Sequence, residues 1–406
     1  MKNNKLWNKD YLLLLQGMGI SQFGDILYSL AISYYVYEKT GSTLLMSLIT
    51  SISMITRTVL LPFSGAIVDR LNRKRIIVAM DLIRGIIMLL FAALSFHNQL
   101  STTTIMICSF ICATCNTLFS PAVNTISVDI LTKETLIQGQ SIYNGTQSTI
   151  DLIGNSLSGA IVAIFGIAPI ILLNGISFLI SAITEWFIDI PLIEKKGSPS
   201  IKMIIKDVLY GGKLSITLPL VNQFMMTSIL LNIFGSGLQT MLLPISLSKG
   251  LLLEEYGIFL SGISAVGIIA SFMMGILKIK HFSKFNFMIY MFMLSNILII
   301  ASLACSNKWL FMSLFILSTF AKIFANSIFN ASFMISIPQE NRGTLFGFMA
   351  SCGSLGAALS TTIYGFLGEY ISLSWVSVIG SLLIIFVFIK FKAKKNKDVL
   401  EIFDTL

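Results

Sequence analysis

The sequence predicts an all-α membrane protein with twelve transmembrane helices, arranged as two six-helix pseudo-repeats. The chain of 406 residues is 55% hydrophobic and only 12% charged, whereas soluble domains carry about 25% charged residues. Apolar runs recur from end to end, each near the length of about 20 residues that crosses a bilayer. They are continuously apolar, which favours helices over the alternating pattern of membrane β-barrels. The composition therefore excludes a soluble protein.

Twelve apolar runs follow one another along the chain. In the first half they cover residues 11–37, 43–67, 76–97, 102–129, 139–165 and 167–190. In the second half they cover residues 218–247, 256–277, 285–305, 308–336, 343–370 and 372–391. We expect six-helix bundles at 1–190 and 218–391, a cytoplasmic linker at 191–217 and a cytoplasmic tail at 392–406. Segments 131–139 and 337–343 also resemble each other, as expected of two parallel repeats. In transporters built this way, the substrate site lies between the two six-helix halves.

Lysine and arginine gather on one side of the expected membrane. That side holds both termini and the linker, whereas the other side holds only Lys39, Lys249 and Lys308. Positively charged loops stay in the cytoplasm, so both termini are expected there. The same distribution explains the net charge of +9 without a nucleic-acid partner. Because the composition is rich in Ile, Asn and Lys, as in AT-rich bacterial genomes, we expect a multi-pass protein of a bacterial cytoplasmic membrane.

The chain offers no chemistry for an enzyme, a cofactor or a metal. Its five cysteines lie in apolar spans without nearby histidine or carboxylate ligands. The glycine-rich phosphate loop of nucleotide-binding proteins is missing from the sequence. We therefore expect a transporter driven by an ion gradient, most simply of protons.

A short charged segment, residues 65–75, joins the second and third spans. Gly65 precedes Asp69 by one helical turn and would let two helix ends approach closely. Asp69 lies among Arg70, Arg73 and further cations, which indicates an ion-pair network rather than a simple topology signal. Asn72, in the turn, tolerates positive φ better than most residues.

This segment, Gly65-x-x-x-Asp69-Arg70-x-Asn72-Arg73-Lys74, resembles the loop signature called motif A of the major facilitator superfamily. The usual second glycine is replaced by Asn72. The resemblance implies a cytoplasmic gate that pairs the two halves in the outward-open state. It assigns that role to Gly65, Asp69, Arg70 and Arg73. The residues expected to complete the network lie near the same face: Asp81, Arg84 and Asp129.

Three further patterns look like the macrolide-efflux (Mef-type) branch of drug:proton antiporters. They are residues 38–42, residues 81–84, and the Pro-x-Glu-x-Arg-Gly pattern of 338–343. In the fifth span, Gly154, Asn155 and Gly159 resemble the antiporter signature, with Asn155 in place of its proline. A packing face of small residues explains the same glycines equally well.

Charged residues inside apolar spans are costly and indicate function. Asp25 and Arg57 lie equally far along the sequence from Gly41. In an antiparallel hairpin they would share one depth, so we expect an ion pair between them. Either Asp25 exchanges a proton beside Arg57, or the pair only fixes helix packing.

Three other charges need partners. Asp151 is a candidate proton site or a counter-ion for a cationic substrate, or else a protonated, hydrogen-bonded carboxyl. Lys322 either pairs with Asp151 across the halves or binds an anionic group of the substrate. Glu185, near a span end, is expected at the membrane interface.

Amides are expensive in lipid, so polar residues on the first, fourth, seventh and tenth spans are expected to line a cavity. These candidates are Gln22, Asn116, Asn124, Gln239 and Asn326. Aromatic candidates on the same spans are Tyr28, Phe119, Phe224 and Phe324.

The sequence predicts a monomeric secondary transporter in the lipid bilayer that exports an amphiphilic, drug- or macrolide-like molecule in exchange for protons by alternating access. One alternative is an exporter of an endogenous metabolite such as a siderophore or peptide. Another is a membrane sensor or immunity protein that does not transport. Motif A argues against the sensor, because a static scaffold needs no gate.

Overall fold

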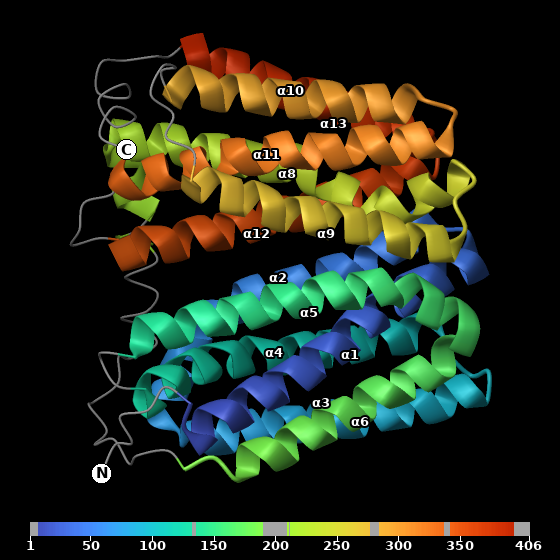
Figure 1. Cartoon of the computed structure of the whole chain (residues 1–406), viewed down its shortest axis with the longest axis vertical. Helices are drawn as coiled ribbons and strands as arrows, with labels where there is room; N and C mark the ends of the chain where they lie inside the picture. The colour runs from blue at the N-terminus through green and yellow to red at the C-terminus, as the bar shows by residue number, and fades with distance from the viewer. Residues whose placement is uncertain are drawn as a thin grey trace. The chain divides into compact units, whose positions relative to one another are not determined.

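The computed structural model describes residues 7–131, 135–189, 209–210, 212–276, 284–336 and 342–393, and this part of the chain contains helices and no strand. The first six long helices are α1 (Lys9–Thr40), α2 (Thr43–Arg70), α3 (Arg73–Phe96), α4 (Thr102–Ile130), α5 (Leu136–Phe165) and α6 (Ile167–Trp186). The next six are α8 (Pro219–Ser248), α9 (Leu253–Ile276), α10 (Lys284–Ala304), α11 (Lys308–Ser336), α12 (Arg342–Gly368) and α13 (Leu373–Ala393) (Figure 1).

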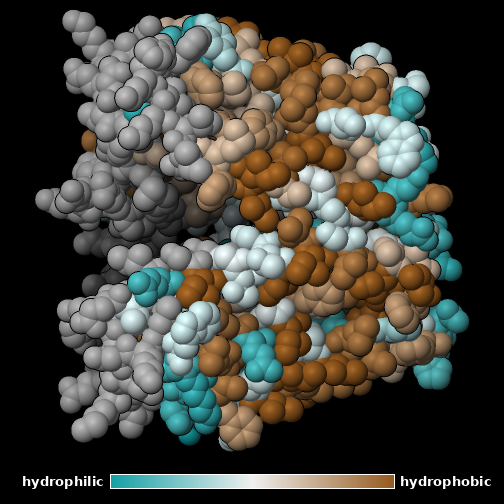
Figure 2. Space-filling model, in the orientation of Figure 1, coloured by the Kyte–Doolittle hydropathy of each residue, from teal (hydrophilic) through white to brown (hydrophobic). Residues whose placement is uncertain are grey.

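Each expected span corresponds to one of these helices, so the all-α membrane fold is confirmed. Ten of the helices are long and apolar enough to cross a membrane. Helix α1, which carries Asp25, is the least apolar of the twelve. Hydrophobic residues cover much of the visible surface over the helices, and hydrophilic residues gather toward helix ends (Figure 2). This is the surface that a lipid bilayer requires.

The segment 65–75 is almost entirely helical rather than a loop. Helix α2 continues through Arg70, and α3 already begins at Arg73. Asn72 does not use the positive φ that asparagine tolerates, since its φ is −70°. Its side chain instead caps α3 by accepting a hydrogen bond from the backbone N–H of Arg75 at 3.3 Å, as asparagine commonly does at this position.

The chain divides into two compact units. Unit 1 comprises Met1–Gly41 and Ile52–Ile204, and unit 2 comprises Ser42–Ser51 and Ile205–Leu406. Helix α2 therefore belongs to unit 2 at its beginning and to unit 1 thereafter. Most of the expected linker, the whole of 394–406, and the pattern residues Pro338 and Glu340 lie outside the described residues.

In unit 1, α1 packs against α5 and α6, and α3 packs against α4 and α6. Gly24 permits the close contact of α1 with α6. A Cβ atom added there would lie 2.5 Å from both Asn174 Oδ1 and Ser177 Oγ. This approach brings the polar groups of α6 next to Asp25.

Unit 2 has an aromatic core. Phe292 stacks on Phe388 with ring centroids 4.1 Å apart, and Phe224 packs on Phe329 at 5.4 Å. Phe224 was expected to line a cavity, but it is fully buried in this core. Phe324 is likewise buried, against Phe287 and Phe320. Burial of rings on all sides satisfies the hydrophobic effect better than exposure to a polar cavity.

The first turns of α2 pack on the end of α12 within unit 2. The carboxylate of Glu369 accepts hydrogen bonds from the backbone N–H of Leu44 at 2.9 Å and from Ser42 Oγ at 2.6 Å. It therefore caps the helix N-terminus, where a negative charge is favourable. These bonds, that to the Leu44 N–H first, lower the pKa of Glu369 below its ordinary value of 4.5.

We expect Glu369→Ala to reduce the unfolding free energy by about 1 kcal/mol, the usual value of a helix cap. The lowered pKa means that the folded state prefers the ionised form, so this stabilisation is present above the ordinary pKa and is lost as pH falls through the folded pKa. Thermal melting of wild type and Glu369→Gln should therefore differ at pH 7 and converge in acid. Glu254→Gln is the matched control, because Glu254 is an exposed helix-end carboxylate without a hydrogen bond in the described structure. An equal effect of both substitutions would contradict the cap.

Candidate functional site

A polar cavity of about 500 Å³ lies inside unit 1. It is formed by α1, α4 and α5, with Arg84 of α3 at its wall. The structure brings together six of the residues singled out from the sequence here: Gln22, Asp25, Arg84, Asn116, Phe119 and Asn124. These residues belong to three helices, α1, α3 and α4, that are far apart in the sequence. They line one cavity only because the helices pack together in the bundle.

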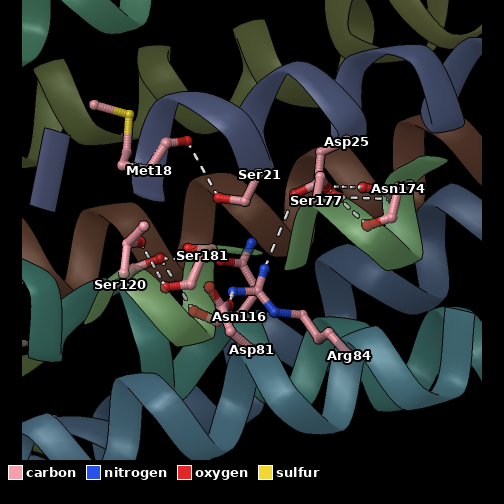
Figure 3. A network of polar contacts seen from close by, with 11 residues as sticks. Met18, Ser21, Asp25, Asp81, Arg84, Asn116, Ser120, Asn174, Ser177 and Ser181 are labelled. Carbon is pink, nitrogen blue, oxygen red and sulfur yellow. Dashed lines mark hydrogen bonds and ion pairs between the residues drawn. The ribbon is translucent and has the colours of Figure 1, made fainter. Parts of the chain in front are cut away.

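Arg84 connects two carboxylates at this wall. It forms an ion pair with Asp81, one helical turn before it on α3. On its other side, Arg84 Nη1 lies 3.9 Å from Asp25 Oδ2 of α1. The side chains of Asp81 and Arg84 are 0% and 4% exposed, whereas that of Asp25 is 45% exposed. Asp25 is thus the open end of a buried charge network (Figure 3).

Aromatic rings and an amide hold this network in place. The guanidinium of Arg84 lies 4.6 Å from the ring centroid of Phe119 and 4.3 Å from that of Phe178. Such cation–π contacts favour the charged form in a place without bulk water. The Nδ2 group of Asn174 on α6 donates to Asp25 Oδ1 at 3.3 Å. Four helices therefore meet at these few atoms.

The expected ion pair between Asp25 and Arg57 is wrong. Asp25 pairs with Arg84, and Arg57 is exposed and forms no ion pair with any described residue. Equal distance from Gly41 fixes only the depth of two residues in a hairpin. The direction of each side chain around its helix axis decides the partner, and α1 packs chiefly on α5 and α6.

Glu185, which was expected at the membrane interface near the end of its span, is buried in unit 1 one residue before α6 ends. It is 0% exposed, and neither of its carboxyl oxygens has a hydrogen-bond partner in the described structure. Sequence reasoning also missed Asn174 and Ser181 of α6. Their signal was present, because Asn174, Ser177, Ser181 and Glu185 recur at helical spacing and form one polar face in an apolar run.

Asp151 lies on α5 and is exposed, and it accepts a hydrogen bond from Gln22 Nε2 at 2.7 Å. On the same helix, Gly154 packs on α1, where an added Cβ would lie 3.1 Å from Ile26 Cγ2. Asn155 is half-buried and Gly159 is buried. The tight contact of Gly154 accords with the packing explanation of these small residues, and the antiporter signature stays a prediction.

The expected gate residues are only partly described. The backbones of Gly65, Asp69 and Arg70 belong to α2 and that of Asp129 to α4, but their side chains lie outside the described part. Arg73 begins α3 and is half-buried. Asp81 and Arg84 lie deeper on α3, in the network with Asp25. The gate itself stays a prediction.

Unit 2 contains a second cavity, of about 300 Å³, between α8, α10 and α11 with contributions from α12 and α13. Gln239, Lys322 and Asn326, three of the candidates taken from the sequence, line it. Each unit thus has its own polar cavity, with a carboxylate in one and an ammonium group in the other.

Comparison with known proteins gives a family match and several relatives. A family model described as the Major Facilitator Superfamily matches residues 14–361. Macrolide efflux protein A of Streptococcus pyogenes is 24% identical over 191 residues, 47% of this chain and 47% of that protein. The uncharacterized MFS-type transporter YfmI of Bacillus subtilis is 27% identical over 206 residues, 48% of this chain and 49% of that protein. The chain therefore spans about half the length of the curated relatives it matches.

Solved structures share the fold at low sequence identity. A point mutant of the nucleoside transporter NupG superposes with a TM-score of 0.77 at 15% identity, over 96% of this chain and 99% of that one. A bacterial homologue of the iron transporter ferroportin gives 0.74 at 16% identity, over 95% and 98%. A bacterial homologue of the lysosomal transporter Spinster gives 0.71 at 13% identity, over 98% and 97%. At these identities the likeness concerns the fold alone.

We expect Arg84→Gln to destabilise the protein by about 3 kcal/mol or more, because it leaves Asp81 as an unpaired buried charge. The double variant Asp81→Asn/Arg84→Gln should recover most of that loss, since both charges are then removed. Thermal unfolding in detergent measures both effects. Arg57→Gln is the matched control, being an exposed arginine within a span. A loss for Arg57→Gln as large as for Arg84→Gln, or no recovery in the double variant, would rule out this account of the network.

Proposed function

The chain belongs to the major facilitator superfamily, and on that premise we propose that it is a secondary active exporter that exchanges protons for an amphiphilic small molecule. The observation that carries the proposal is the position of Asp25, half-exposed in the unit 1 cavity and 3.9 Å from a buried arginine. The family consists of membrane transporters that cross the bilayer many times. The coupling ion, the direction and the substrate are our proposals.

Two carboxylates share one cation in this network, so it carries an excess negative charge when both are ionised. Asp81 is buried against Arg84, and its charge is neutralised by that contact. Asp25 lies farther from the guanidinium and faces the cavity, so it has the weaker compensation and the better access to water. Of the two, Asp25 is therefore the group that gains and loses a proton.

Protonation of Asp25 has a mechanical consequence. A neutral Asp25 no longer attracts Arg84, so the tie between α1 and α3 is lost, while the hydrogen bond with Asn174 can still hold α1 to α6. A proton arriving from one side of the membrane can thus favour one arrangement of these helices over another, which is the requirement for coupling by alternating access. Asp151, hydrogen-bonded to Gln22, is the second candidate acid.

The proposed cargo is drug- or macrolide-like. The name of the streptococcal relative, Macrolide efflux protein A, supports macrolides as the first compounds to test. The polar and aromatic wall formed by Gln22, Asn116 and Phe119 suits an amphiphile. We place the protein in the bacterial cytoplasmic membrane with both termini inside, where export would confer resistance to such compounds.

We expect Asp25→Asn to abolish substrate uptake driven by a pH gradient in inverted membrane vesicles, to the level of vesicles without the protein. Downhill exchange of labelled for unlabelled substrate, which needs no proton, should persist. The panel begins with erythromycin and adds amphiphilic amines, amides and acids.

Asp189→Asn is the matched control, because Asp189 is an exposed carboxylate shortly after the end of α6, outside the cavity. Asp151→Asn is measured in the same assay, because Asp151 is the other candidate for the carboxylate that exchanges the proton. If no compound in the panel shows flux that depends on the pH gradient, or if Asp25→Asn and Asp151→Asn both transport like wild type, proton antiport is wrong.

A further inference from the structure

The cavity of unit 2 contains a lysine whose charge has no partner in the described structure. Lys322 lies in the middle of α11 and lines the cavity of about 300 Å³. Its ammonium group makes no hydrogen bond or ion pair with any residue that the structure describes, whereas Lys308 at the start of the same helix binds Glu255 at 2.6 Å. Charged residues within a membrane ordinarily pair or serve function.

The described part of unit 2 has no acid at this depth. Its carboxylates are Glu254, Glu255 and Glu369, all at helix ends. Glu255 is bound to Lys308, and Glu369 caps α2. Unit 2 therefore leaves the positive charge of Lys322 available to whatever enters the cavity.

Amide groups extend this charge into a polar stripe. Asn326 and Asn330 follow Lys322 at intervals of four residues, and all three line the cavity. At this spacing they share one face of α11 over about 12 Å of helix. Neither asparagine side chain has a hydrogen-bond partner within the described structure.

Two other features complete a binding surface. The Oγ atom of Ser295 on α10 is buried without a hydrogen-bond partner in the described structure, and this serine, 1% exposed, also lines the cavity. On the apolar side the lining includes Phe234, Phe292 and Phe329. The cavity thus offers one cation, several hydrogen-bond donors and an aromatic wall.

We propose that this cavity binds the carboxylate of an organic anion whose body carries amide or hydroxyl groups and an apolar portion. Lys322 neutralises the carboxylate, the amides of Asn326 and Asn330 bind the polar groups, and the aromatic wall covers the rest. The inference rests on the proposed export function and narrows its cargo from drug- or macrolide-like amphiphiles in general to amphiphilic acids. It also predicts that simple cations are rejected, since Lys322 repels them.

The test is equilibrium binding to the full-length protein in lipid nanodiscs, with empty nanodiscs subtracted. The probes are N-acetylphenylalanine, its neutral amide N-acetylphenylalaninamide, and the cation phenylalaninamide, each titrated calorimetrically in a buffer without chloride. We expect the acid to bind at least about tenfold more tightly than its amide, as a charge-assisted hydrogen bond provides. The cation should not bind.

Lys322→Gln should remove the preference for the acid, and Lys322→Arg, which keeps the charge, should retain most of it. Lys308→Gln is the matched control on the same helix, and thermal melting verifies that each variant is folded. Equal binding of acid and amide, a preference for the cation, or a preference that survives Lys322→Gln would overturn the proposal. So would the absence of saturable binding by all three probes.

A chloride titration tests whether the site binds inorganic anions instead of organic acids. If titrated chloride binds in a manner that depends on Lys322 while N-acetylphenylalanine does not, the site takes inorganic anions only and the organic cargo is wrong. Because binding is measured without a pH gradient, failure of proton antiport would leave this result intact. Conversely, proton-driven export that Lys322→Gln leaves unchanged for every compound would overturn the cargo site and preserve the antiport.

Discussion

The positive charge of Arg84 has to be accommodated inside an apolar bundle, and much of unit 1 is arranged to do so. Asp81 supplies a buried counter-ion from the same helix, and Phe119 and Phe178 bring two ring faces from α4 and α6. Asp25 adds a second carboxylate from α1. An unpaired guanidinium in hydrocarbon would cost several kcal/mol. The network thus constrains how four helices pack, and it leaves one carboxylate facing the cavity.

The two units differ in the charge that they present. Unit 1 places a carboxylate beside a fixed cation, an arrangement in which gain of a proton changes the balance of attraction between helices. Unit 2 places an ammonium group among amides and aromatic rings, where its charge can hold an anion. On our proposals, unit 1 couples to protons and unit 2 selects the cargo. The division follows from chemistry, because a carboxylate beside a cation can respond to protons, whereas an ammonium group attracts anions.

Relatives inform the fold of this chain more than its substrate. The superfamily model covers most of the sequence, whereas the identity to Macrolide efflux protein A is 24% over about half of each chain. On our proposals, the features that distinguish a cargo lie in the cavity walls, at positions such as Lys322 and Asn326, rather than in the shared motif. A macrolide amine and the unit 2 cavity would repel each other, so the substrate panel has to include acids.

The sequence by itself determined the number of helices, their approximate ends, the superfamily and which polar residues avoid lipid. Composition and apolar length suffice for the helices and the polar residues because each depends on one segment at a time, and the superfamily was indicated by the resemblance of residues 65–75 to motif A. The tertiary structure alone decided which charges meet. Asp25 and Arg57 share a depth along the hairpin, yet Asp25 pairs with Arg84, and Glu185 is buried although it lies near a helix end. Pairing depends on the rotation of each helix about its axis and on the choice of neighbouring helices, and both result from the packing of the whole bundle.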